Sequence, residues 1–183
     1  MTTSRFQKIT LMLVAATVTV ACSRDSPASA DGVSYSVEEV PLHQISDDLA
    51  AGRASSVAVT QGYIARIEAM DEALNSVIAI APDALDQAAA SDARRTAGAA
   101  RGPLDGVPIL LKDNLDAIGM PTTAGSFALE ANVPDRDSEV ARRLRAAGAV
   151  ILGKANLSQF AGFRNTASFN GSTVGGSPRN PYD

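Results

Sequence analysis

The sequence predicts an α/β fold, because segments with helical periodicity alternate with short apolar segments of strand length. The clearest strand, residues 107–112, is apolar on both faces, which predicts a central strand with helices on each side of the sheet. Apolar residues make up 45% of the 183-residue chain and charged residues 20%, so a packed core is expected.

The first two predicted helices lie in the region 42–70. A short helix over 42–51 ends before Gly52, and a second begins after the capping residues Ser55 and Ser56. The apolar stripe of the second helix repeats at helical spacing and consists of Val57, Thr60, Ile64, Ile67 and Met70.

Two further helices are predicted on either side of a long loop. An alanine-rich helix runs from Asp83 to about Ala97, before Gly98. A helix from about 138 to 147 has acidic residues at its start and arginines toward its end, as the helix dipole favours.

Three apolar runs predict strands at 77–80, 107–112 and 150–153. Pro108 fits poorly inside a central ladder and is tolerated only near the start of a strand. After residue 161 the chain becomes rich in glycine and serine.

Residues 1–21 are predicted to be a signal peptide. Arg5 and Lys8 precede an apolar run over 9–21 that is too short to span a bilayer easily. The run ends at Thr19-Val20-Ala21-Cys22, which resembles a bacterial lipobox, in which the cysteine is lipidated and becomes the new N-terminus. Cleavage after Ala30 in an A-x-A site is the alternative.

Either cleavage predicts an exported protein, lipid-anchored in the bacterial cell envelope through Cys22 or free in the periplasm. The membrane is then a partner only through that anchor. Residues 22–36 are predicted to be a flexible tether and residues 37–183 to form the folded part.

Composition excludes several functions. The net charge is −4, and losing Arg5 and Lys8 with a leader makes it −6, which argues against nucleic acid as a partner. One cysteine and one histidine, Cys22 and His43, cannot build a zinc site, and no metal or other cofactor is expected. A Ser-His-Asp triad would have to rely on His43, in a weakly patterned region.

The placement of the lysines is the most informative feature, since the chain has thirteen arginines and only three lysines. Lys112 and Lys154 each close an apolar run and each open a Lys-x-Asn-Leu tetrapeptide. Both are predicted to be partly desolvated, which lowers the pKa of an ammonium and produces a neutral amine that can act as a general base. The alternative for Lys112 is an ion pair with Asp113 or another carboxylate that keeps it charged.

Residues 148–155 match a phosphate-binding P-loop except at the final position, where Ala155 replaces Ser or Thr. A P-loop follows a strand, whereas Ala149 to Leu152 are predicted to be the strand itself. Nucleotide binding is therefore not favoured.

Four motifs together resemble the amidase signature family, in the family's order and over some eighty residues. They are Gly102-Pro103-Leu104-Asp105-Gly106-Val107-Pro108-Ile109-Leu110-Leu111-Lys112-Asp113-Asn114, Gly119-Met120-Pro121-Thr122-Thr123-Ala124-Gly125-Ser126, Gly148-Ala149-Val150-Ile151-Leu152-Gly153-Lys154-Ala155-Asn156-Leu157-Ser158, and Arg179-Asn180-Pro181-Tyr182. The stretch 156–164 looks most like bacterial peptide amidases, with Gln159 in place of a common Glu.

The resemblance implies a mixed sheet covered by helices on both faces and an amidase that uses a Ser–cis-Ser–Lys triad on a small-molecule or peptide amide. Lys112 takes the position of the family's base. Supporting roles are expected for Asp113, Asn114, Ser126, Lys154 and Asn156, although turn formation explains several of these polar residues equally well.

The resemblance also implies that both catalytic serines lie beyond Asp183, because the family's Gly/Ser-rich segment follows its Asn-Pro-Tyr motif. Ser172 and Ser177 precede Asn180-Pro181-Tyr182 and cannot take those roles. The expectation is the N-terminal part of an amidase domain. Two alternatives stay open: a non-catalytic envelope lipoprotein, and a tRNA-dependent amidotransferase component, which an export signal disfavours.

Overall fold

A three-stranded mixed sheet forms the centre of the computed structural model, which describes residues 35–162 and 171–182. The strands are β1 (Val77–Ile80), β2 (Pro108–Lys112) and β3 (Val150–Ala155), in the spatial order β1-β3-β2. β1 runs antiparallel to β3, and β2 runs parallel to it. The α/β class and the mixed sheet predicted from sequence are confirmed.

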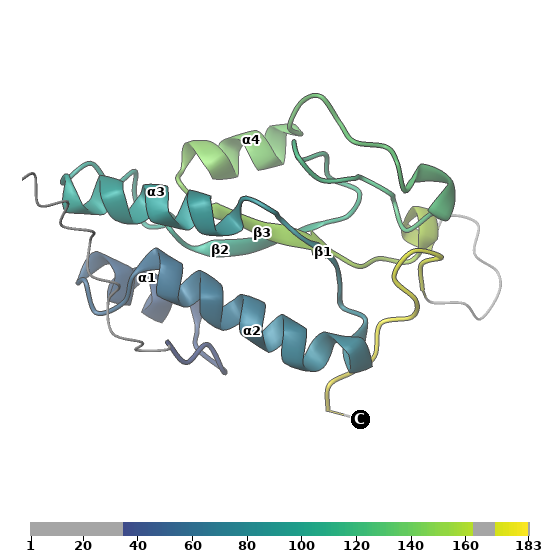
Figure 1. The fold of residues 1–183 in the computed structure, drawn as a ribbon, viewed down its shortest axis with the longest axis horizontal. Coiled ribbons are helices and arrows are strands. Elements are labelled where there is room, and N and C mark those ends of the chain that lie inside the picture. The colour runs from purple at the N-terminus through teal and green to yellow at the C-terminus, as the bar shows by residue number, and fades with distance from the viewer. Residues whose placement is uncertain (1–34, 163–170, 183) are drawn as a thin grey trace, which may run out of the picture. The chain divides into compact units, whose positions relative to one another are not determined.

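Helices cover both faces of this sheet (Figure 1). α1 (Leu42–Ala50) and α2 (Ser56–Leu74) lie on one side, while α3 (Ala84–Thr96) and α4 (Glu139–Ala146) lie on the other. α4 forms the crossover between the parallel strands β2 and β3, the usual way to connect parallel neighbours. Two short 3₁₀ helices, η1 (Phe127–Leu129) and η2 (Gln159–Gly162), follow β2 and β3.

Within the three described strands β3 lies in the middle and not the predicted strand 107–112, whose place in the sheet of the whole protein stays a prediction. β3 occupies the centre and is buried from Val150 to Lys154, whereas β2 is an edge strand that is only partly buried over most of its length. Pro108 lies at the first position of this edge strand, where proline is tolerated.

Close approach of β1 to β3 explains the glycine within the central strand. A Cβ atom at Gly153 would lie 2.1 Å from the carbonyl oxygen of Ala79, so any side chain would push the two strands apart. β3 continues to Ala155, two residues past the predicted end, because Ala155 still pairs with Val77 on one side and Lys112 on the other.

The helix boundaries follow the predicted caps within one residue. Ser55 accepts a hydrogen bond from the amide of Ala58 at the start of α2, and Ser138 accepts one from Ala141 at the start of α4. Asn75 ends α2 in the left-handed conformation, with φ of 52°. The predicted stripe of α2 is too long at its end, since Met70 is 40% exposed.

Two aliphatic clusters make up the core. The larger joins the sheet to α3 and α4 through residues such as Ala88, Leu111, Ala141 and Ile151. The smaller packs α1 and α2 around Leu49, Val59 and Val107. The two clusters position both ends of β2, where the candidate functional residues lie.

The predicted leader and Cys22 lie outside the described residues. Tyr35 belongs to the predicted tether, and its hydroxyl donates a 2.7 Å hydrogen bond to Asp48 of α1. Among residues 35–162 and 171–182, none of the helices has the length and apolar character that a membrane span requires.

Candidate active site

Lys112 and Lys154 end neighbouring strands but have opposite environments. Lys154 is fully buried, whereas Lys112 is exposed. The register explains the difference: Lys154 lies beside Leu111, which is buried, and Lys112 lies beside Ala155. Successive side chains of a strand point to opposite faces, so the two lysines project from opposite faces of the sheet.

The Lys154 ammonium is enclosed by acceptors. Its Nζ atom lies 2.9 Å from Oδ1 of Asp113, 3.1 Å from Oγ1 of Thr122 and 3.2 Å from the carbonyl oxygen of Pro121. An ammonium has three N–H donors, and each has one of these acceptors within reach. Burial of this charge is tolerated because it is paired and fully hydrogen-bonded.

Asp113 is the fixed centre of this arrangement and is also fully buried. One carboxylate oxygen accepts from Lys154, and the other accepts from the amide and the hydroxyl of Thr123. Its backbone amide donates to Ala155, and its carbonyl accepts from Ala124. Asp113 therefore ties the loop after β2 to the end of β3.

The alternative in which Lys112 pairs with Asp113 is not what the structure contains. The carboxylate of Asp113 belongs to Lys154, and Lys112 takes part in no ion pair within 35–162 and 171–182. Lys112 is exposed among the described residues, where β2 lies at the edge of the sheet, and its desolvation in the whole protein stays a prediction. The burial predicted for Lys154 is confirmed, because it belongs to the central strand, but there it forms an ion pair with Asp113.

The other residues predicted to support the site lie in different environments. Asn114 is exposed in the turn after β2. Ser126 is 3% exposed, and its hydroxyl accepts a 3.3 Å hydrogen bond from the side chain of Gln159. An ionised Glu at position 159 could not donate this hydrogen bond. The Gln that this chain has in place of the common Glu can donate it.

Asn156 connects three segments that are distant in sequence. Its Nδ2 atom donates to the carbonyl oxygens of Asn75, Gly175 and Gly176, at 2.7, 3.1 and 3.1 Å. Its Oδ1 atom accepts from the amide of Leu157. The geometry assigns Asn156 a structural contact that holds the Gly/Ser-rich stretch against the end of α2.

Sequence reasoning missed the contribution of Thr122 and Thr123. Both lie in the second motif, and both bond to the buried Lys154–Asp113 pair through side-chain oxygens. The signal available was two hydroxyl residues after Pro121 in a glycine-containing loop, which by itself is typical of a turn.

Two rejected alternatives have clear structural reasons. Residues 150–155 form a strand that includes Gly153 and Lys154, so the P-loop-like pattern does not open a helix. The second alternative is a Ser-His-Asp triad that uses His43. Ser46, one helical turn from His43, donates its hydroxyl hydrogen bond to the carbonyl oxygen of Pro103 instead. Within the described ranges there is no group of three or more His, Cys, Asp or Glu side chains that could hold a metal.

Comparisons with known proteins identify the family of the chain. The model of the Amidase family matches residues 58–183. The peptide amidase of Stenotrophomonas maltophilia superimposes with a TM-score of 0.76 and 47% identity, covering 80% of this chain and 31% of that protein. An amidase family protein of Bacillus anthracis gives a TM-score of 0.74 at 31% identity, covering 80% of this chain and 30% of that one.

Curated relatives include a component of the glutamyl-tRNA(Gln) amidotransferase of Salinispora arenicola, 44% identical over 136 residues, or 74% of this chain and 27% of the relative. The same component from Thermobifida fusca is 45% identical over 136 residues, or 74% and 26%. The fold, the motifs and these matches define a chain of the amidase class. It belongs to the amidase signature family and spans less than a third of the length of these relatives.

Proposed function

We propose that the protein is an amide hydrolase in which Lys112 is the general base. The observation that carries the proposal is the separation of the two lysines. The carboxylate nearest to Lys112 in sequence, Asp113, is neutralised by Lys154 on the opposite face of the sheet. The Lys112 amine therefore stands at the end of β2 with no carboxylate of the described residues in ion-pair contact.

The proposed chemistry requires Lys112 in its neutral form. The amine accepts a proton, through a bridging serine, from a nucleophilic serine that attacks the amide carbonyl. The same proton then reaches the leaving nitrogen, so ammonia or an amine departs and an acyl-enzyme remains for water to hydrolyse. By family resemblance both serines follow residue 183 in the whole protein.

The proposed substrate is a linear carboxamide, either a small molecule or a peptide amide. The 47% identity to the peptide amidase of S. maltophilia supports this class. The amidotransferase relatives support a second candidate, a component that releases ammonia from an amide for transfer. Ammonia release from a peptide amide without any tRNA or partner protein would favour the hydrolase over this second candidate.

The main test compares two lysine variants in the protein expressed from its complete coding sequence. Lys112→Ala is expected to lower kcat/KM for a simple amide by about 10²–10⁴-fold, since a positioned general base contributes that much. Lys154→Arg keeps a cation beside Asp113 and is expected to leave measurable turnover. Unchanged activity in Lys112→Ala would show that the base lies elsewhere.

A second measurement separates the hydrolase from a non-catalytic envelope protein. The 183-residue chain purified alone is expected to release no ammonia from an amide, because the proposed serines are not among its residues. Lys112-dependent release from this chain would contradict that assignment. Inactivity of the whole protein on amides, together with an in-frame sequence that lacks the two serines, would favour the non-catalytic alternative.

We also propose that the protein is exported and anchored in the bacterial envelope by a lipid on Cys22. The lipobox-like stretch 19–22 after an apolar run supports this proposal. Palmitate labelling that disappears in Cys22→Ala is the expected result. Labelling that persists in Cys22→Ala would place the lipid elsewhere and contradict the proposal, and no labelling of the unaltered protein would favour cleavage after Ala30.

A further inference from the structure

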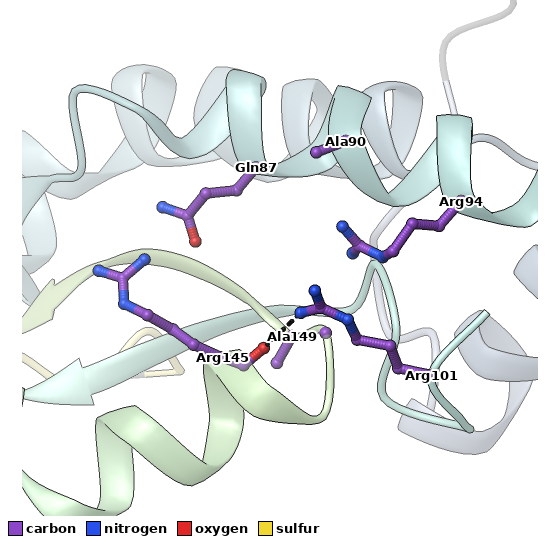
Figure 2. Close-up of a pocket in the computed structure, with 7 residues that line it drawn as sticks. Gln87, Ala90, Arg94, Arg101, Arg145 and Ala149 are labelled. Atoms are coloured by element: carbon purple, nitrogen blue, oxygen red, sulfur yellow. Dashed lines mark hydrogen bonds between the residues drawn. The ribbon is translucent and has the colours of Figure 1, made fainter. Parts of the chain in front are cut away.

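The side chains of Arg94 and Arg101 approach each other in a cleft between α3 and the end of α4, whereas the side chain of Arg145 extends away from both (Figure 2). The cleft has a volume of about 170 Å³ and includes Arg94 of α3, Arg101 of the following turn and Arg145 of α4. Among the described residues that line it, none is acidic. This is unusual for a chain with a net charge of −4.

Arg94 is held in place by a buried carboxylate. Its Nη2 atom lies 2.6 Å from Oδ1 of Asp105, and its Nε atom lies 3.3 Å from Oδ2. Asp105 is fully buried, while the Arg94 side chain remains 23% exposed. A guanidinium has five N–H donors, so donors of Arg94 remain for a ligand in the cleft.

Arg101 and Arg145 are also fixed by the fold. The backbone amide of Arg101 donates to Asp105, and its Nη1 atom donates to the carbonyl oxygen of Arg145 at 3.0 Å. Arg145 pairs with Asp137 at 3.1 Å. Arg101 is therefore oriented by one N–H donor and keeps others for a ligand, whereas the Arg145 guanidinium is directed to Asp137 and to the carbonyl oxygen of Ile118.

Helix stability explains part of this arrangement. Arg94 and Arg145 lie in the last turns of α3 and α4, where a positive charge stabilises the helix dipole. Arg101 comes from neither helix, and its guanidinium has no carboxylate partner among residues 35–162 and 171–182. Of the three arginines that line the cleft, Arg101 is the one whose charge the described ion pairs leave uncompensated.

We propose that this cleft binds a small oxyanion of the phosphate class. Planar guanidinium groups recognise phosphate oxygens through paired hydrogen bonds, and here the groups are oriented before any ligand arrives. The volume exceeds the roughly 30 Å³ of one water molecule several-fold, which accommodates a tetrahedral oxyanion.

The oxyanion cleft is separate from the candidate active site. Ala149 lies at the beginning of β3 and lines the cleft, whereas Lys112 pairs with Ala155 at the other end of that strand. Six residues of extended chain span about 20 Å. The proposal therefore does not depend on the assignment of Lys112 as a base.

The phosphate can come from two sources, free phosphate or the headgroup of an anionic phospholipid. Both present the same oxygens to Arg94 and Arg101. The first test is titration of the full 183-residue chain with inorganic phosphate at constant ionic strength, followed by calorimetry and by the NMR signals of the arginine Nε–H groups. We expect a dissociation constant of about 1 mM, from two or three charge-assisted hydrogen bonds.

The discriminating variant is Arg101→Gln, with Arg143→Gln as its matched control. Arg143 lies two residues from Arg145 on α4, but its side chain is 75% exposed and is paired with Glu139 outside the cleft. Both variants remove one positive charge. Arg94 is left unchanged because its removal would leave the buried Asp105 without its cation.

Arg101→Gln is expected to weaken phosphate binding about tenfold, while Arg143→Gln stays within about twofold of the unaltered chain. Equal thermal melting of both variants checks that the fold is kept. No saturable binding below about 20 mM phosphate, or equal loss in the two variants, would overturn the proposal.

Vesicles distinguish the two sources. A chain carrying Cys22→Ser, which cannot be lipidated, is mixed with phosphatidylglycerol or with neutral phosphatidylcholine vesicles. Retention on the anionic vesicles that Arg101→Gln abolishes and free phosphate competes away assigns the cleft to a lipid headgroup. Phosphate binding without vesicle retention assigns it to a soluble phosphate. The proposal is contradicted if the chain does not bind phosphate and if neither Arg101→Gln nor added phosphate changes its retention on the vesicles.

Discussion

Two buried carboxylates, Asp113 and Asp105, lie at opposite ends of β2 and are neutralised in different ways. Asp113 pairs with Lys154, and both side chains are 0% exposed. Asp105 is also 0% exposed, but its partner Arg94 is 23% exposed and lines the oxyanion cleft. All three N–H donors of the Lys154 ammonium have acceptors within the protein. The Arg94 guanidinium has five N–H donors, so it can bind the Asp105 carboxylate and still offer donors to a ligand.

The comparison teaches that a buried ion pair has a different role when one partner stays accessible. The closed Lys154–Asp113 pair fixes the end of β2 and the loop around Thr122 and Thr123. The open Arg94–Asp105 pair fixes the turn before β2 and also orients a cleft. The first is expected to matter most for stability and the second for binding.

The largest effect is expected from breaking the closed pair. Lys154→Met leaves Asp113 without its cation in a fully buried position and is expected to lower the free energy of unfolding by about 3–5 kcal/mol. Urea unfolding of the 183-residue chain measures this. Lys112→Met is the matched control, since an exposed substitution changes stability by about 0.5 kcal/mol or less. Equal losses in the two variants would contradict the assignment of Lys154 as the buried lysine.

A smaller loss is expected from breaking the open pair. Arg94→Met removes the cation from Asp105, but the carboxylate keeps the hydrogen bond from the amide of Arg101, and Arg94 is partly screened by solvent. The free energy of unfolding should fall by about 1–3 kcal/mol in the same urea measurement. A loss larger than that of Lys154→Met would reverse the ranking of the two pairs.

The smallest effect concerns acid stability. Burial alone would raise the pKa of Asp105, but the hydrogen bonds from Arg94 and the Arg101 amide hold that pKa below its usual value. The unfolded chain therefore binds more protons in acid, and stability falls as the pH drops below about 4. The contribution is complete above the unfolded pKa and is lost as the pH passes the lower, folded pKa.

Asp105→Asn should make the fall in the free energy of unfolding below about pH 4 less steep, by at most about 1.4 kcal/mol per pH unit, the limit for one titrating group. Urea midpoints between about pH 2 and 5, a window around the usual aspartate pKa, compare the variant with the unaltered chain. Asp48 keeps its own contribution, because hydrogen bonds from Tyr35 and Arg53 lower its pKa. The loss of stability in acid should therefore become less steep but not disappear. An unchanged pH dependence in Asp105→Asn would exclude Asp105 as a contributor to it.

Local signals in the sequence were sufficient for most of the secondary structure. The capping serines Ser55 and Ser138 and the apolar run 77–80 predicted their elements to within one residue. The order of strands could not be obtained in the same way, because β2 and β3 are both apolar on both faces. Which of them is central depends on pairing with β1, which lies far away in the chain.

The candidate site shows the same limit. Lys112 and Lys154 have nearly identical local sequences, and their burial differs because, in the described sheet, β2 lies at the edge and β3 at the centre. Their roles as base and supporting residue stay predictions. Asp113 pairs with Lys154 rather than with its neighbour Lys112 because of the register between β2 and β3. The local sequence around Asp113 does not contain this information.

The contacts of Asn156 have a consequence for the order in which the chain folds. The carbonyls that its amide binds belong to Asn75 and to Gly175 and Gly176, so the contact forms only when α2, β3 and the last described segment have met. Contacts between distant parts of a chain form late, because closing a long loop costs entropy. The segment around Gly175 should dock last and open first, making it the region where amide hydrogens exchange before those of β3.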